Sequence, residues 1–93
     1  MANLFISYDL HQPGRDYEPV WNAIKALSPN WARVHLSLWW IKTTLTADQV
    51  RDRISLALDA NDSLIVIDAT NNRAAWRNLS DEVANYMFQN WNY

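Results

Sequence analysis

Apolar and polar residues alternate through the middle of the chain, in the segment NWARVHLSLWW that begins at Asn30. Successive side chains of a β-strand point to opposite faces of the sheet, so this alternation predicts strand structure. One face receives four apolar side chains, those of Val34, Leu36, Leu38 and Trp40. The opposite face begins polar and then becomes apolar, with Arg33, His35, Ser37, Trp39 and Ile41. A face that met only water would not carry these last two residues.

Two other short runs are typical of strands. The first, residues 4–9, is apolar and aromatic and precedes a loop marked by Pro13 and Gly14. The second, SLIVIDA at residues 63–69, is almost wholly apolar. Uniformly apolar strands occur where both faces are covered, so we expect both faces of residues 63–69 to be buried.

Three segments carry helical signals. Residues 16–27 have apolar positions at helical spacing, with Pro19 in the first turn, where its missing N–H costs little. The sequence TADQ at residues 46–49 matches a capping box, and SDE at residues 80–82 places acids at a helix start. The expected buried stripes are Val50, Ile54, Ala57 and Leu58 in the second helix and Val83, Met87 and Trp91 in the third.

The stretch from Arg33 to Thr44 is longer than a usual strand of about five or six residues. It is interpreted as two strands with a bend near Leu36 and Ser37, or as one strand with a bulge. The two-strand interpretation gives the order β-α-β-β-α-β. The predicted fold class is therefore α+β, a ferredoxin-like split β-α-β sandwich with an extra C-terminal helix, in a single domain of residues 1–93.

A two-layer sandwich of this kind leaves one face of its sheet bare. The sequence predicts that this bare face carries Phe5, His35, Trp39 and Ile41. A large exposed apolar patch on a monomer would be unusual. We therefore expect a homodimer, packed sheet to sheet through these four residues.

Composition narrows the functional classes. The chain has no cysteine, which excludes disulfides and thiolate metal sites. Its net charge is −2, whereas nucleic-acid-binding domains usually carry a basic patch, so RNA or DNA binding would need a local cluster or a bridging metal. The N-terminal apolar stretch is too short for a signal peptide, and no run approaches the length of a membrane span. A cytoplasmic protein without a membrane partner is expected.

Four segments resemble a known family. They are the first strand ending in SYD at Asp9, the helix that follows it, RVHLSLWW from Arg33, and NDSLIVIDAT from Asn61. Over about residues 3–69 the chain is similar to the small CRISPR-associated adaptation proteins, the second Cas protein, and to the VapD-type toxin ribonucleases that share their fold. It departs from the CRISPR-associated motif at His35, which replaces a Gln, and at LWW (residues 38–40), which replaces Val-Phe-Glu and loses the acid. The helical tail replaces a strand that the family exchanges between subunits. The chain therefore resembles a divergent, stand-alone member.

The resemblance implies a homodimeric endonuclease or endoribonuclease. Asp9 would bind Mg²⁺ or Mn²⁺ for phosphodiester cleavage. Arg33 and Ser37 match the family's second-strand motif and, with Arg15, are the candidate nucleic-acid contacts. A toxin–antitoxin role would follow from the VapD-type relatives.

The topology adds a second carboxylate to this site. The last strand should run antiparallel beside the first, which would bring Asp62 near Asp9, and two carboxylates suit a Mg²⁺ ion that keeps several waters. His11, two residues past Asp9, is a candidate acid or base near neutral pH. The structural alternatives are a turn cap for Asp9, a helix end for Asp62, a solvated loop for His11 and a buried, hydrogen-bonded role for His35.

Trp31, Trp39 and Trp76 are candidates for base stacking or for interface packing. Two functions therefore stay open. One is the metal-dependent nuclease, favoured by Asp9 in its motif. The other is a non-catalytic dimeric interaction module that binds a protein or a nucleotide-like ligand, favoured by the acidic charge balance and the lost Glu.

Overall fold

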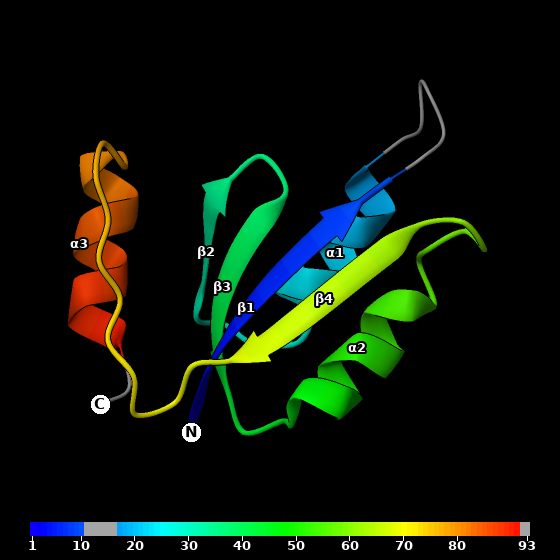
Figure 1. Ribbon diagram of the computed structural model, residues 1–93, viewed down its shortest axis with the longest axis horizontal. Helices are drawn as coiled ribbons and strands as arrows, with labels where there is room; N and C mark the ends of the chain where they lie inside the picture. The colour runs from blue at the N-terminus through cyan, green and yellow to red at the C-terminus, as the bar shows by residue number, and fades with distance from the viewer. Residues whose placement is uncertain (11–16, 92–93) are drawn as a thin grey trace.

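The computed structural model describes residues 1–10 and 17–91. The sheet order is β2-β3-β1-β4, and every neighbouring pair is antiparallel. This is the strand order of a ferredoxin-like sandwich, so the predicted fold class is confirmed, including the added C-terminal helix (Figure 1). The elements in chain order are β1 (Ala2–Asp9), α1 (Glu18–Lys25), β2 (Trp31–His35), β3 (Leu38–Thr43), α2 (Ala47–Ser55), β4 (Ser63–Asp68) and α3 (Asp81–Asn90).

The helix starts follow the predicted capping chemistry. Pro19 lies in the first turn of α1. The Thr46 hydroxyl accepts the Gln49 backbone N–H at 3.2 Å, and the Gln49 side chain accepts the Thr46 N–H at 3.0 Å, which completes the capping box of α2. The Ser80 hydroxyl accepts the Val83 N–H at the start of α3.

The stretch from Arg33 to Thr44 is a hairpin of two strands, as the first of the two interpretations predicted. The turn lies at Leu36 and Ser37, and the pairing shifts register between Arg33 and His35. The Arg33 guanidinium helps to close this hairpin, because its Nε and Nη2 atoms donate to the Leu36 carbonyl at 3.3 and 2.9 Å.

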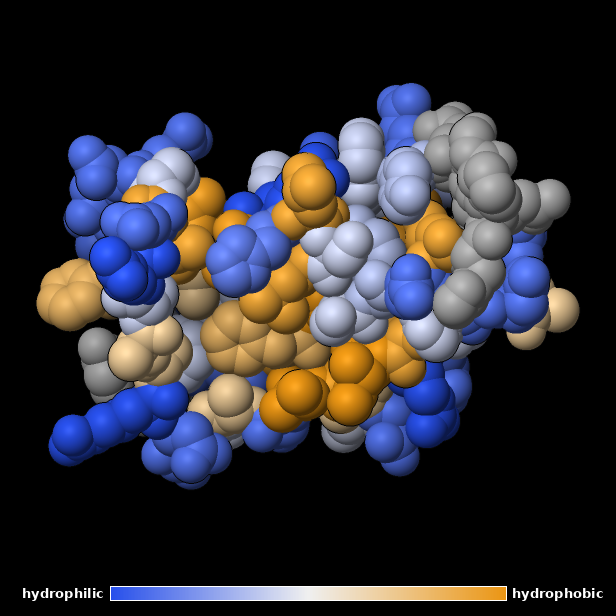
Figure 2. Space-filling view, turned by 45° about the horizontal axis from the view of Figure 1, so that its top comes forward, coloured by the Kyte–Doolittle hydropathy of each residue, from blue (hydrophilic) through white to orange (hydrophobic). Residues whose placement is uncertain are grey.

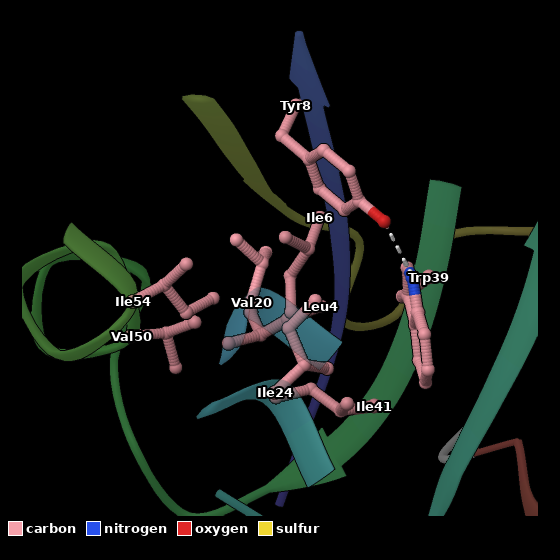
Figure 3. Close-up of a cluster of buried hydrophobic side chains, with 9 residues drawn as sticks. All are labelled: Leu4, Ile6, Tyr8, Val20, Ile24, Trp39, Ile41, Val50 and Ile54. Carbon is pink, nitrogen blue, oxygen red and sulfur yellow. Dashed lines mark hydrogen bonds between the residues drawn. The ribbon is translucent and has the colours of Figure 1, made fainter. Parts of the chain in front are cut away.

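The main core lies between the sheet and the helices α1 and α2. The even-numbered residues of β1 point into it and meet two apolar side chains from each helix (Figure 3). Tyr8 brings a hydroxyl into this core, where it accepts Trp39 Nε1 at 3.3 Å and Trp21 Nε1 at 3.0 Å. The nine buried members are Leu4, Ile6, Tyr8, Val20, Ile24, Trp39, Ile41, Val50 and Ile54.

The predicted placement of Trp39 and Ile41 on the bare face is wrong. Their cross-strand partners on β1 are Ile6 and Leu4, which face the helices, and directly paired residues share a face. Trp39 is 2% exposed and Ile41 is fully buried. Neither side chain is therefore available to a second subunit, and the interface predicted through them is corrected.

The opposite face of the sheet, which we call the outer face, is covered on its β2–β3 side by α3. A second core forms there from Ala32, Trp40, Met87 and Trp91. The Trp91 ring stacks on Trp40 at 6.2 Å and contacts Phe5 at 5.8 Å between ring centroids. Phe5 lies on the predicted face, but a helix of the same chain packs against it.

The outer face of β4 is not covered by α3. Leu64 and Val66 pack against the main core, whereas Ile65 and Ile67 are 57% and 51% exposed. The prediction that both faces of residues 63–69 are buried is therefore wrong. In Figure 1 the edge strand β4 and α3 lie on opposite sides of β1.

Candidate functional site

Predicted site residues meet at one end of the sheet, which we call the Asp9 end. Asp9 is the last residue of β1 and pairs with Ser63, the first residue of β4, so Asp62 lies one position beyond this pair. The hairpin turn reaches the same end, where the Tyr8 N–H donates to the Ser37 carbonyl at 3.2 Å. The neighbouring positions of Asp9 and Asp62, expected from the topology, are confirmed.

The two carboxylates differ in their surroundings. Asp9 is exposed at the strand end. Asp62 is half-buried, and its Oδ2 atom accepts the Asp59 N–H at 2.8 Å, while the Asp62 N–H donates to the Asp59 carbonyl at 3.1 Å. This reciprocal turn gives Asp62 a structural role in the loop between α2 and β4, although not at the helix end that the sequence suggested, since α2 ends at Ser55. One of its oxygens accepts a hydrogen bond within the loop, and of the two metal-ligand candidates Asp9 is the more exposed to solvent.

A cation site would need further oxygen or nitrogen ligands, since Mg²⁺ takes six in near-octahedral geometry, several of them waters. Within residues 1–10 and 17–91, no three His, Asp or Glu side chains are grouped closely enough to hold a metal ion. The predicted acid or base His11 and the predicted nucleic-acid contact Arg15 lie outside the described residues. Among the predicted ligands that the structure describes, Asp9 and Asp62 are the pair brought together, without a third acidic or histidine side chain grouped with them in the described residues.

Arg33, a predicted nucleic-acid contact, is engaged inside the protein. Besides its two hydrogen bonds to Leu36, its guanidinium lies 4.4 Å from the Trp21 ring centroid and 5.8 Å from that of Trp39. Contacts of this kind contribute about 0.5–2 kcal/mol each, depending on exposure. A structural role at the hairpin therefore accounts for Arg33 without a phosphate.

A second cation, Lys25, contacts the tryptophan rings beside Arg33, and the sequence did not predict this contact. Lys25 at the end of α1 places its ammonium 4.9 Å from the Trp31 ring centroid, and the Trp31 and Trp39 rings lie 5.4 Å apart. Trp39 is buried, so the prediction that it stacks on a base is wrong. Trp31 is half-buried beneath Lys25, and Trp76, at 40% exposed, is the most accessible of the three stacking candidates.

His35 is exposed at the end of β2, so the expected buried role is wrong for this residue. It lies beside the outer face, near the segment that contains Trp76, and the two residues line one cavity. His35 remains a candidate for a contact with a ligand or partner.

Asp68 lies at the end of the sheet opposite Asp9, as predicted, and pairs with Leu4. Hydrogen bonds from the Thr70 hydroxyl and from the Thr70 backbone N–H, the latter at 2.9 Å, hold the pKa of its carboxyl below the ordinary value of 3.8. The Thr70 hydroxyl also accepts the Asn3 N–H at 3.3 Å. Asp68 therefore fastens the end of β4 to β1.

No known protein-family model matches the chain. Among the helices of residues 1–10 and 17–91, none combines the length and apolar character needed to cross a bilayer. The Asp9 end has one exposed carboxylate, Asp9, one half-buried carboxylate hydrogen-bonded in a turn, Asp62, and the guanidinium of Arg33, which contacts groups of the same chain.

Proposed function

We propose that the protein is a homodimeric interaction module, assembled through the edge strand β4. The observation that carries the proposal is the exposure of Ile65 and Ile67 on the outer face of that strand. Figure 2 shows apolar side chains gathered in the middle of the molecular surface seen in that view. An exposed apolar edge of this kind is a template for pairing with another chain.

The backbone of β4 also supports pairing. Among the described strands it neighbours β1 alone, so one side of its backbone lies at the sheet edge. Natural sheets protect such edges with lysine, proline, bulges or very short strands. The sequence SLIVID has neither lysine nor proline, and its six residues pair with β1 in unbroken register. Within this strand the single charged side chain is that of Asp68 at its last position, so residues 63–67 carry no charge that would oppose a second chain.

The hydrogen-bond pattern predicts which backbone groups face the open edge. The Ala69 N–H donates to the Asn3 carbonyl at 2.8 Å, which continues the β1–β4 register beyond Asp68. Hydrogen-bonded and non-hydrogen-bonded pairs alternate along an antiparallel ladder. The odd-numbered residues of β4 therefore bond to β1, and Leu64, Val66 and Asp68 direct their N–H and C=O groups outward.

A second copy related by a two-fold axis can satisfy these groups. If Val66 pairs with Val66 of the other copy, Ile65 lies opposite Ile67 in both directions. All four isoleucines then share one outer surface of a continuous sheet across both copies. Such a pairing is isologous and closes, because the same strand serves both subunits. This two-fold register is the specific form of the proposal.

Charge on β4 should break this dimer. We expect sedimentation equilibrium at tens of micromolar protein, a concentration on the order of a moderate dimer dissociation constant, to show that the wild-type protein is a dimer. At the same concentration the variant Ile67→Lys should be a monomer. Phe88→Lys is the matched control, since Phe88 is 67% exposed but lies on α3, and it should leave the dimer intact. A wild-type monomer at about 100 µM, or equal dissociation by both variants, would exclude assembly through β4.

The chain has no cysteine, so introduced thiols can report the register. Opposite residues of a non-hydrogen-bonded pair have Cα atoms about 4.5 Å apart, within disulfide reach. An oxidised equal mixture of Ile65→Cys and Ile67→Cys should form cross-linked heterodimers, whereas either variant alone should not. Strong cross-linking of Ile65→Cys with itself would instead indicate a register that pairs Ile65 with Ile65.

A second candidate function rests on the Asp9 end. The exposed Asp9 carboxylate next to Asp62, in a strand-end motif that resembles the CRISPR-associated and VapD-like families, supports a divalent-metal-dependent endonuclease or endoribonuclease. We favour the interaction module over this nuclease, because one oxygen of Asp62 accepts a hydrogen bond within its turn. We therefore expect folded wild-type protein to leave single-stranded RNA and duplex DNA uncleaved in Mg²⁺ or Mn²⁺.

The nuclease assay includes a chelator and the variant Asp9→Asn, which keeps the side-chain size but loses the anionic ligand. Cleavage that requires metal and collapses in Asp9→Asn would establish the nuclease and make Asp9 its metal ligand. Asp48→Asn is the control, because Asp48 lies in the first turn of α2, away from the Asp9 end.

A further inference from the structure

A cavity of about 320 Å³ opens between the outer face of the sheet and the segment that leads into α3. Eight of its ten lining residues are apolar. The sheet contributes Phe5, Val34 and Leu38, and the opposite wall includes Trp76, Leu79 and Met87. Ligand pockets begin at about 300 Å³ and are mostly apolar, with a few polar groups that orient the ligand. The cavity therefore suits a small ligand.

The two remaining lining residues are His35 and Arg77. They approach from different elements, because His35 ends β2 and Arg77 lies in the segment before α3. Both side chains can donate hydrogen bonds, and Arg77 carries a permanent positive charge. No described lining residue is acidic, so neither group is neutralised within the cavity wall.

We propose that this cavity binds a small amphipathic carboxylate, such as a medium-chain fatty acid or an aryl acid. The apolar body lies against Phe5, Leu38 and Trp76, and the carboxylate is held by Arg77 and His35. A guanidinium presents paired N–H groups that match a carboxylate in a fork geometry. A guanidinium and an imidazole among otherwise apolar lining residues together define this ligand class.

A nucleotide fits the same cavity less well. Its sugar hydroxyls and base edges need hydrogen-bond partners, and each polar group buried without one costs free energy. Apart from His35, Arg77 and the indole N–H of Trp76, the lining side chains offer no hydrogen-bonding groups. A ligand whose polar atoms are confined to one end avoids this cost, which favours the carboxylate.

The test uses octanoate and its uncharged analogue 1-octanol, with binding followed by NMR chemical-shift titration of the full chain. We expect wild type to bind octanoate with a dissociation constant on the order of 1 mM or below, given the size of the ligand. Arg77→Gln should weaken octanoate binding by about tenfold or more and change octanol binding less than about twofold, since only the carboxylate loses a charged hydrogen bond.

Arg73→Gln is the matched control, because Arg73 precedes the same segment but lines a neighbouring cavity, and it should leave both affinities unchanged. Ala75→Trp fills the site from an exposed position and should abolish binding of both ligands. Absence of octanoate binding at 10 mM, on the order of ten times the expected constant, equal losses in Arg77→Gln and Arg73→Gln, or tighter binding of adenosine monophosphate would each overturn the proposal.

Discussion

Replacing Trp39 by Ala is expected to lower the free energy of unfolding by about 3–5 kcal/mol, as large-to-small changes of buried aromatic residues do. Trp39 is 2% exposed, packs among the side chains of the main core and donates its Nε1 hydrogen to the Tyr8 hydroxyl at 3.3 Å. The substitution would leave a cavity and remove that donor. Urea denaturation followed by circular dichroism measures the loss.

The control for this prediction is Trp76→Ala. Trp76 is 40% exposed, so its removal should cost less than about 1 kcal/mol. Both variants should be measured at two protein concentrations, because the proposed dimer would add a concentration-dependent term to the apparent stability. If the Trp39→Ala variant kept wild-type stability but no longer formed the proposed dimer, Trp39 would lie in the interface, which would contradict its placement in the core.

Local chemistry made much of the fold predictable. The capping box at Thr46 and Gln49 and the cap at Ser80 depend on residues within a few positions of each other, as do the helical stripes. The stripe of the second helix was predicted too long, because α2 ends at Ser55, before Ala57 and Leu58. The strand order also followed from the alternation of strands and helices, since the split arrangement has few unstrained connections. These signals do not require knowledge of what packs on each face.

The assignment of the two sheet faces could not be predicted in this way. The hairpin carries large apolar residues on both faces, so alternation alone does not say which set meets the helices. The register shift between Arg33 and His35 also interrupts the alternation. Pairing with β1 decides the question, because Leu4 and Ile6 fix the inner face opposite Ile41 and Trp39.

In the candidate site, too, some features could be predicted from the sequence and others could not. The adjacency of Asp9 and Asp62 was predictable from topology, because antiparallel neighbours bring the end of one strand to the start of the next. The engagement of Arg33 was not, because it depends on where the hairpin turn brings the Leu36 carbonyl and on how α1 places Trp21. The position of a long side chain depends on tertiary contacts, and a short sequence motif carries no information on those contacts.

Removal of the Trp91 side chain is the second large effect that we expect, again about 3–5 kcal/mol of unfolding free energy. Trp91 directly follows α3, is 7% exposed, stacks on Trp40 and contacts Phe5. Its Nε1 atom also donates to the Asn72 carbonyl at 3.2 Å, which ties α3 to the chain that follows β4. Trp91→Ala would therefore loosen the cover of the outer face as well as create a cavity.

Phe88→Ala is the matched control for Trp91→Ala, since it removes an aromatic side chain that is 67% exposed, and it should cost less than about 1 kcal/mol. Comparison of the two variants distinguishes the loss of stability due to removing a buried side chain from that due to removing any aromatic side chain near the C-terminus. If α3 covers the outer face as described, Trp91→Ala should also increase the fluorescence of a dye that binds exposed apolar surface, at temperatures below its unfolding transition. Equal stabilities and equal dye fluorescence for both variants would show that α3 does not contribute to the core. The outer face would then be uncovered, as expected for a two-layer sandwich.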